Sequence, residues 1–330
     1  IRRQGRCTCG HWTTLCKGAL ILTLGLTAIG TWLPDTRITN LDRLEAFNMK
    51  ESFVREKVGF LELARKPQQL DSSDLCVKAW EDLQHKHPFP TESVECSIVC
   101  TQNPDGHGLP HTSAIVHRKL GLPTSCAVFD ISLGCSGFTY GFSILQAFMQ
   151  AHGFRTGVLF TADPYSKVMD ENDKKTSTLF GDGATAALVT DQPVWTSGKF
   201  VFGSDGTKWD GIIVRDGTLH MNGRAVFTFS VRVVPESIRE MLRQNDCSLD
   251  QVDRLLLHQG TLHIVNAIAD ELGVPREKCR FYAADYGNTI SSSVPMVLAV
   301  EFDNPDLNTL LIAGFGVGLS WASTVLRRTR

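Results

Sequence analysis

The chain has 330 residues, 42% of them hydrophobic, and a formal net charge of -2 at pH 7. This length and apolar content support a large core, in two domains or one duplicated domain. The nearly balanced charge, without a Lys/Arg-rich run, excludes nucleic acid as an expected partner. The ten cysteines are scattered without the dense spacing of a disulfide framework, which favours reduced thiols and a cytoplasmic location.

The first 23 residues are left as an unassigned N-terminal extension. The run Gly18–Leu33 is apolar, but it is too short to span a membrane and lacks a clear cleavage site, so no membrane association is predicted. Its later part, Leu24–Gly30, is predicted to be the first core strand. The possible metal ligands in this segment lack a second ligand pair at a structural zinc spacing, so no metal site is predicted. They are Cys7, Cys9, His11 and Cys16.

Apolar runs of strand length alternate along the chain with helical patterns, which indicates an α/β protein with a largely buried sheet. We predict strands at 20–29, 94–101, 125–133, 156–162, 184–190, 198–203, 211–215, 253–257 and 308–313. We predict helices at 71–84, 111–120, 137–152, 226–245, 261–272 and 292–302.

The two halves of the chain have the same outline, a strand followed by a polar or reactive residue and then a helix. Asp130–Cys135 has this arrangement in the first half and Leu255–His258 in the second. The stretch Thr190–Gly198 contains Pro and Gly and is the best boundary. We therefore expect an N-terminal half at 24–192 and a C-terminal half at 193–330.

Cys135 is the residue with the clearest chemical potential. It follows an apolar run that stops at Gly134, and a helical pattern begins at Phe138. Unpaired backbone N–H groups and the helix dipole favour a thiolate at a helix N-terminus. A small buried hydrophobic residue is the alternative interpretation of this cysteine.

Three further segments place polar residues or glycines where a strand ends or a loop turns. His258 ends a buried strand, where a satisfied core histidine is equally consistent with the spacing. Asn288 lies in a glycine-containing polar loop, which is also typical of a turn. The glycines of Gly314–Gly318 permit close approach of a ligand to the backbone, but the Gly-Lys-Ser/Thr ending of a P-loop is absent.

In their order and surroundings, six motifs together resemble those of β-ketoacyl-acyl carrier protein synthase III, the initiating condensing enzyme of type II fatty acid synthesis. The resemblance runs from about Leu24 to Arg327. It implies a thiolase fold, with two similar α/β halves in five αβαβα layers and usually a homodimer. The motifs are Asp130–Gly141, Leu179–Ala184, Leu219–Gly223, His258–Gln259, Tyr286–Thr289 and Gly314–Trp321.

The resemblance assigns a catalytic triad to Cys135, His258 and Asn288. A thiolate at Cys135 attacks an acyl thioester and carries the acyl group covalently. A malonyl thioester then loses carbon dioxide, and N–H groups of His258 and Asn288 stabilise the enolate that forms. The resemblance also implies a second oxyanion hole formed by the backbone N–H groups of Cys135 and Val317, although the family usually has glycine where Val317 stands. No metal or redox cofactor is implied.

The substrates implied are an acyl-coenzyme A or acyl carrier protein thioester, and malonyl-acyl carrier protein or malonyl-coenzyme A. At the donor entrance the family commonly has Trp and Arg, where this chain has Phe53 and Lys57, and Lys174 replaces a second Arg. Thr261 replaces an Asn, and His263 replaces a basic residue. These departures predict a divergent synthase, in fatty acid initiation or in specialised or polyketide metabolism, that takes medium-chain or unusual acyl groups rather than acetyl-coenzyme A. The predicted substrate-binding residues are Phe53, Lys57, Lys174, Phe180, Gln259, Thr261, His263 and Phe315.

Three alternatives compete with this interpretation. A relative that forms an ester or amide without decarboxylation has no enolate for Asn288 to stabilise. A cysteine protease would need a context such as Gly-Ser-Cys-Trp around its nucleophile, which is absent. A non-catalytic subunit of a heterodimer would have lost the cysteine, whereas Cys135 is present.

Overall fold

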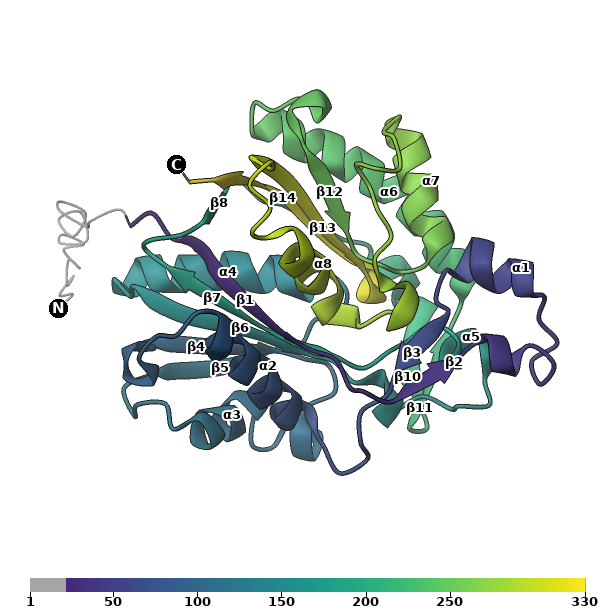
Figure 1. The fold of residues 1–330 in the computed structure, drawn as a ribbon, viewed down its shortest axis with the longest axis horizontal. Helices are drawn as coiled ribbons and strands as arrows, with labels where there is room; N and C mark the ends of the chain where they lie inside the picture. Colours follow the sequence, from purple (N-terminus) through teal and green to yellow (C-terminus); the bar gives the residue numbers. More distant parts are fainter. Residues whose placement is uncertain (1–21, 330) are drawn as a thin grey trace, which may run out of the picture.

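The computed structural model describes residues 22–329, which form one large sheet covered and separated by helices (Figure 1). The ten-stranded sheet has the order β12-β13-β14-β8-β1-β7-β6-β4-β5, with β9 also paired to β14. The strands of the first half are β1 (Gly25–Trp32), β4 (Cys96–Cys100), β5 (Ala127–Ile131), β6 (Thr156–Ala162) and β7 (Ala184–Thr190). Those of the second half are β8 (Trp195–Ser197), β9 (Val201–Ser204), β12 (Arg254–Leu257), β13 (Thr309–Gly316) and β14 (Ser320–Arg328).

The strand order and directions of the first half recur in the second. In the first half β4 and β6 are parallel, and β7 lies antiparallel between β6 and β1. In the second half β12 and β13 are parallel, and β14 lies antiparallel between β13 and the short strands β8 and β9. Because β8 pairs with both β14 and β1, it joins the two blocks of strands. The boundary predicted at 192/193 falls just before β8 and stays a prediction.

The major helices occupy three layers around the two blocks of strands. They are α2 (Ser72–Lys86), α3 (Thr112–Leu120), α4 (Gly137–His152), α6 (Gly223–Gln244), α7 (Leu262–Leu272) and α8 (Ser293–Glu301). Figure 1 shows α2 and α3 on one side of the molecule, α6 and α7 on the opposite side, and α8 between the strand blocks. Helices α4 and α8 supply the middle layer, because their apolar residues share one core cluster with strands of both halves.

Alternation along the strands produces this layering. Ile98 of β4 belongs to the central cluster, and the next residue, Val99, to the cluster under α2 and α3. Leu256 of β12 likewise faces the centre, whereas Leu255 and Leu257 face α6 and α7. Successive side chains of a strand point to opposite faces of the sheet. A strand that is covered on both faces therefore has a continuous run of apolar residues in the sequence. The predicted α/β thiolase-like fold in five αβαβα layers is confirmed.

Every predicted strand and helix of the described chain overlaps an observed one, with two informative differences. Helix α6 begins at Gly223, earlier than predicted, because the Asn222 side chain accepts the N–H of Ala225 and caps it. Strand β14 is absent from the prediction. Its buried positions include Ser320, Ser323 and Thr324, so it lacks the apolar run that marks the other core strands.

Smaller elements gather at one end of the sheet. They are β2 (Arg37–Thr39), β3 (Glu62–Ala64), α1 (Glu51–Phe53) with a π-helical segment at Val54–Val58, α5 (Lys174–Ser177), and the hairpin β10 (Ile212–Arg215) and β11 (Thr218–Met221). Figure 1 shows them together on the right of the molecule. Within residues 22–329, no helix combines the length and apolarity that crossing a membrane requires. The possible metal ligands before residue 17 lie outside the described residues.

Candidate active site

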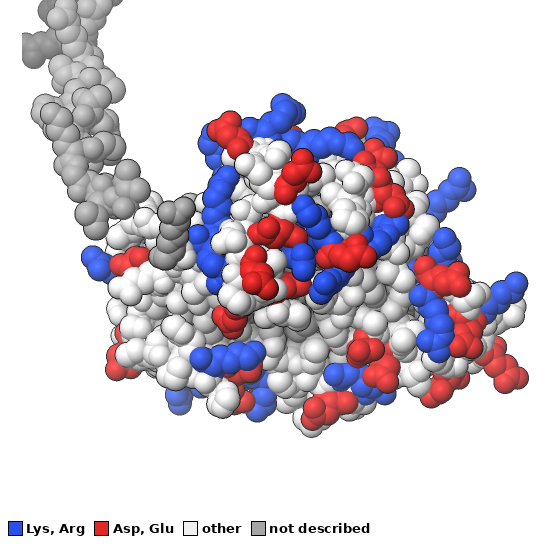
Figure 2. All heavy atoms as spheres, turned by 45° about the horizontal axis from the view of Figure 1, so that its top comes forward, with Lys and Arg blue, Asp and Glu red and all other residues white. Residues whose placement is uncertain are grey.

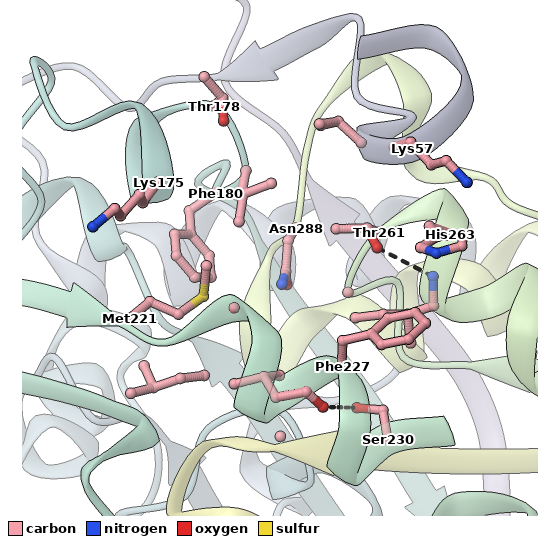
Figure 3. A pocket seen from close by; sticks show the side chains of 18 of the residues that line it. Lys57, Lys175, Thr178, Phe180, Met221, Phe227, Ser230, Thr261, His263 and Asn288 are labelled. Carbon is pink, nitrogen blue, oxygen red and sulfur yellow. Dashed lines mark hydrogen bonds between the residues drawn. The ribbon is translucent and has the colours of Figure 1, made fainter. Parts of the chain in front are cut away.

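A cavity of about 980 Å³ lies where the two halves meet, and it brings Cys135, His258 and Asn288 together. The three side chains are buried, with exposed fractions of 4%, 3% and 5% respectively. Cys135 lies between β5 and α4, His258 follows β12, and Asn288 lies in the loop that leads to α8. Figure 3 shows Asn288 between Phe180 on one side and Thr261 and His263 on the other.

The position of Cys135 depends on glycines in the strand end that packs against it. A Cβ atom at Gly314 would lie 2.7 Å from the Cys135 carbonyl oxygen, and one at Gly316 would lie 2.7 Å from the Cys135 Sγ. Because both positions lack a Cβ, the end of β13 reaches the cysteine directly. The backbone N–H groups of Val317 and of Cys135 itself thereby lie close enough to the sulfur to favour its thiolate form.

The Cys135 thiol is subject to opposing electrostatic effects. Burial raises its pKa to about 12, while the backbone N–H groups of Val317 and Cys135 act in the lowering direction. Cys135 also lies two residues before the first residue of α4, a helix of 16 residues whose N-terminus favours negative charge. The resting side chain is therefore a thiol at neutral pH, in a setting that stabilises negative charge on the sulfur when the proton leaves.

His258 is a neutral imidazole. Burial lowers its pKa to about 3, because the protonated ring would lose its hydration inside the protein. Its Nδ1 is buried and has no hydrogen-bond partner among the described residues. The ring packs edge-on against Phe315, with centroids 5.5 Å apart, and its Nε2 lies 3.5 Å from Nδ2 of Asn288. A neutral histidine here is able to donate one hydrogen bond into the cavity.

The backbone of Asn288 connects two of the motifs. Its N–H donates to the Leu179 carbonyl at 2.9 Å, and its carbonyl accepts the N–H of Gly181 at 2.9 Å. A Cβ at Gly181 would collide with the carbonyl oxygen of Tyr286. The Phe-Gly-Asp-Gly motif is therefore the backbone partner of the loop that carries Asn288. It also places the Phe180 side chain against the cavity.

Most of the predicted substrate-binding residues line this cavity. They are Phe53, Lys57, Lys174, Phe180, Thr261, His263 and Phe315. Gln259 does not line it. Its Nε2 donates to the Leu257 carbonyl, and its Oε1 accepts the N–H of Tyr282, each at 2.8 Å. The Gln259 side chain thus ties the end of β12 to the segment that contains Tyr282. The geometry therefore does not support the predicted contact between Gln259 and the substrate.

The mouth of the cavity is basic. Four exposed lysines line it, and none of them has a carboxylate partner within residues 22–329: Lys50, Lys57, Lys174 and Lys175. His263 stacks on Phe227 with centroids 4.8 Å apart, and burial together with the nearby Lys57 lowers the pKa of His263. Figure 2 shows basic and acidic side chains interspersed over the face that it presents.

The prediction missed a group of residues that complete the wall. They come from the turn after β6, the β10–β11 hairpin and the first turns of α6. The motif Leu219–Gly223 is visible in the sequence without an assignment to the site, and it carries part of this wall. The missed residues on this part of the wall include Tyr165, Ile212, Met221, Val226, Phe227 and Ser230. Among the described residues, no three His, Cys, Asp or Glu side chains are grouped as metal ligands.

Two family models match the chain. The model of 3-oxoacyl-[acyl-carrier-protein (ACP)] synthase III matches residues 129–206, and the model of its C-terminal region matches residues 242–328. The first matched segment begins in β5 and contains Cys135. The second contains His258 and Asn288. The two segments thus contain all three residues that meet at the inner end of the cavity.

Individual relatives match over nearly their whole length. The β-ketoacyl-[acyl-carrier-protein] synthase III of Deinococcus deserti is 31% identical, over 93% of this chain and 91% of the relative. The corresponding synthase III 1 of Halalkalibacterium halodurans is 32% identical, over 92% of this chain and 98% of the relative. The crystal structure of the Thermus thermophilus synthase III superposes with a TM-score of 0.86 at 31% identity, and the match covers 92% of this chain and 99% of that one. The chain therefore belongs to the β-ketoacyl-acyl carrier protein synthase III family and is an acyltransferase that condenses an acyl group with a malonyl thioester.

Proposed function

We propose that Cys135 is the nucleophile that carries the acyl group, and that His258 and Asn288 stabilise the enolate formed from the malonyl substrate. One observation carries this proposal: the three side chains, each at most 5% exposed, meet at the inner end of one cavity. The backbone N–H of Val317 lies near the Cys135 sulfur and acts to lower the pKa of its thiol, against the larger effect of burial. A nucleophile, an oxyanion hole and two neutral N–H donors are the groups that this reaction requires.

In the first half-reaction, the Cys135 sulfur attacks the carbonyl carbon of an acyl thioester. The new S–C bond forms as the carrier's sulfur departs, and the proton of the Cys135 thiol passes to that leaving thiolate. We assign the backbone N–H groups of Cys135 and Val317 as the donors that stabilise the oxyanion of the tetrahedral intermediate, and their proximity to the Cys135 sulfur supports this assignment. The glycine-dependent approach of β13 supports this role, because a bulkier strand end would hold the Val317 N–H away from the sulfur.

In the second half-reaction, a malonyl thioester loses carbon dioxide and its electron pair remains as an enolate. The N–H groups of His258 and Asn288 donate hydrogen bonds to the enolate oxygen. The carbanion then attacks the acyl group on Cys135, a C–C bond forms, and the released Cys135 thiolate is reprotonated. A histidine with a pKa of about 3 is suited to this role, because it remains a neutral donor throughout.

The acyl donor is a thioester of coenzyme A or of an acyl carrier protein, and malonyl-acyl carrier protein or malonyl-coenzyme A is the second substrate. The unpaired lysines at the mouth support a donor that carries phosphate, because each is a cation without a protein anion beside it. Lys57 and Lys174 act as point charges and cannot form the planar fork of arginine. We assign Phe53, Thr261 and His263 to the same entrance.

The working unit is a homodimer in the cytoplasm. Strand β5 lies at the end of the sheet order, and no described strand pairs with its outer edge. Its residues are half-buried and mainly apolar, including Val128, Phe129 and Ile131. An exposed apolar edge is a template for pairing, and a second copy would cover it. The seven cysteines of the described chain are all free, which is typical of a reducing compartment.

The decisive test separates the two half-reactions. The protein is incubated with acyl-coenzyme A donors, and intact-protein mass spectrometry follows acylation in the wild type, Cys135→Ala and Cys135→Ser. Release of labelled carbon dioxide from malonyl-acyl carrier protein is measured in parallel. We expect acylation only when Cys135 is present, and carbon dioxide release that depends on His258 and Asn288. Product formation without carbon dioxide release would favour an ester- or amide-forming enzyme instead.

A further inference from the structure

The cavity is lined by exposed, charged side chains at its mouth and by buried, mainly apolar side chains near the nucleophile. The side chains at the mouth, such as Lys57 and Lys174, are exposed, whereas Tyr165 and Phe180 beside the nucleophile are only 4% and 3% exposed. Tyr165, Phe180 and Ile212 form one apolar cluster with Cys135. An acyl group on the Cys135 sulfur must therefore lie among these buried side chains, and their size sets the space available to it.

Tyr165 is held at both ends. Its ring packs against Phe180 with centroids 4.9 Å apart and planes inclined by 48°. Its hydroxyl donates a hydrogen bond to Oε1 of Gln102 at 3.2 Å. Burial, with Asp163 and Cys135 nearby, raises the pKa of the Tyr165 phenol well above its usual value, so the hydroxyl keeps its proton and remains a donor.

The acceptor of this hydrogen bond is itself fixed. The backbone N–H of Gln102 donates to Oδ1 of Asp163 at 2.8 Å, and Nδ2 of Asn103 donates to the same oxygen at 3.2 Å. A Cβ at Gly134 would lie 2.6 Å from Oε1 of Gln102. The loop that carries Cys135 therefore packs directly onto the Gln102 side chain. Tyr165 cannot swing away without losing its hydroxyl partner and its contact with Phe180.

We propose that Tyr165 is a specificity-determining residue that ends the acyl pocket, so that Cys135 accepts short acyl groups and excludes medium-chain ones. A longer chain would have to displace the Tyr165 ring, because close-packed interiors do not yield continuously. The proposal rests on the proposed role of Cys135 as the acyl carrier. It differs from the medium-chain expectation drawn from the entrance sequence, because it takes the wall beside the sulfur, and not the entrance, to set the length of the acyl chain.

The test compares acetyl-, butyryl-, hexanoyl- and octanoyl-coenzyme A as donors. Rapid-quench mass spectrometry measures the rate of Cys135 acylation by each donor in the wild type, Tyr165→Ala, Tyr165→Leu and Tyr165→Phe. We expect the wild type to prefer acetyl and butyryl donors. The ratio of the octanoyl rate to the acetyl rate is expected to rise by about tenfold or more in Tyr165→Ala. Pocket space for a few additional methylene groups changes the selectivity of an enzyme by about this factor.

The other variants serve as controls. Tyr165→Phe keeps the ring and is expected to retain the wild-type order of donors, while Tyr165→Leu opens the pocket with less risk to folding, which thermal denaturation checks. An unchanged donor profile in folded Tyr165→Ala and Tyr165→Leu would overturn the proposal, as would a wild type that takes octanoyl and acetyl groups at equal rates. Failure of every donor to label Cys135 would instead contradict the proposed nucleophile.

Discussion

Oδ1 of Asn288 accepts the backbone N–H of Ile290 at 2.9 Å, and this hydrogen bond determines which end of the Asn288 amide faces His258. With the oxygen engaged, Nδ2 is left to point toward Nε2 of His258, 3.5 Å away. Ile290 adopts this position at a φ of 54°, in the left-handed region that a β-branched residue rarely occupies. The hydrogen bond from Ile290, two residues further along the chain, thus leaves the Asn288 N–H donor facing the cavity.

Replacing Asn288 with aspartate is expected to separate the two half-reactions. The substituted carboxylate would keep the shape of the Asn288 amide but would place negative charge where the enolate forms. We expect Asn288→Asp to lower the rate of malonyl decarboxylation by about 100- to 1,000-fold, the usual cost of losing one oxyanion donor. Acylation of Cys135 should remain within about tenfold of the wild type. Equal losses in both half-reactions would show that Asn288 supports the whole site and not the enolate specifically.

Adding a methyl group at Gly316 is expected to disturb the nucleophile and the fold together. The new Cβ would lie 2.7 Å from both the Sγ and the Cβ of Cys135, at a φ of 154°. We expect Gly316→Ala to lower the free energy of unfolding by about 1–3 kcal/mol, the cost of overpacking a core position. Alkylation of Cys135 by iodoacetamide should also slow. Urea denaturation measures the first effect, and Gly206→Ala, at an open position, is the matched control.

The decarboxylation step should show no histidine inflection at moderate pH. His258 has a pKa of about 3, well below the usual 6.5, so its neutral form persists from the alkaline range down to about pH 4. We expect the rate of carbon dioxide release to stay level through about pH 5–8 when acylation is not limiting. The measurement is a pH–rate profile with pre-acylated protein. A fall in rate centred near the usual histidine pKa of about 6.5 would mean that His258 is more hydrated than the structure indicates.

Asp163 makes the stability of the protein depend on pH in a direction unusual for a carboxylate. Burial raises its pKa from 3.8 to about 6, so between these values the folded state binds more protons than the unfolded state. Its contribution is thus fully present in acid and is lost as pH rises from about 4 through 6. The loss is of order 3 kcal/mol, since one pKa unit corresponds to about 1.4 kcal/mol.

Asp163→Asn should remove this dependence. We expect the unfolding free energy of the variant, relative to that of the wild type, to increase as pH rises from about 4 to 7. Urea denaturation at several pH values measures the difference, in which the other titrating groups largely cancel. A pH-independent difference would place the folded-state pKa of Asp163 near its ordinary value.

The pattern of apolar residues along the sequence was sufficient to predict the layers of the fold. Apolar runs such as that of β13 marked strands covered on both faces, and helices such as α4 were predicted with their bounds intact. These signals are local, because burial on two faces imposes an apolar residue at every position. Strand β14 was not predicted, because its buried Ser and Thr residues are polar. Only their neighbours in the folded sheet explain why these residues are buried.

The sequence by itself determined the chemistry and the family of this protein, because a cysteine, a histidine and an asparagine stand in ordered motifs on strand ends and glycine loops. Only the tertiary structure decided what those residues face. Gln259, predicted at the substrate, is tied into the backbone, whereas Tyr165, outside every motif, belongs to the same apolar cluster as the nucleophile. Contacts of this kind join residues far apart in the chain, as Gln102 is from Tyr165, and no local pattern in the sequence encodes them.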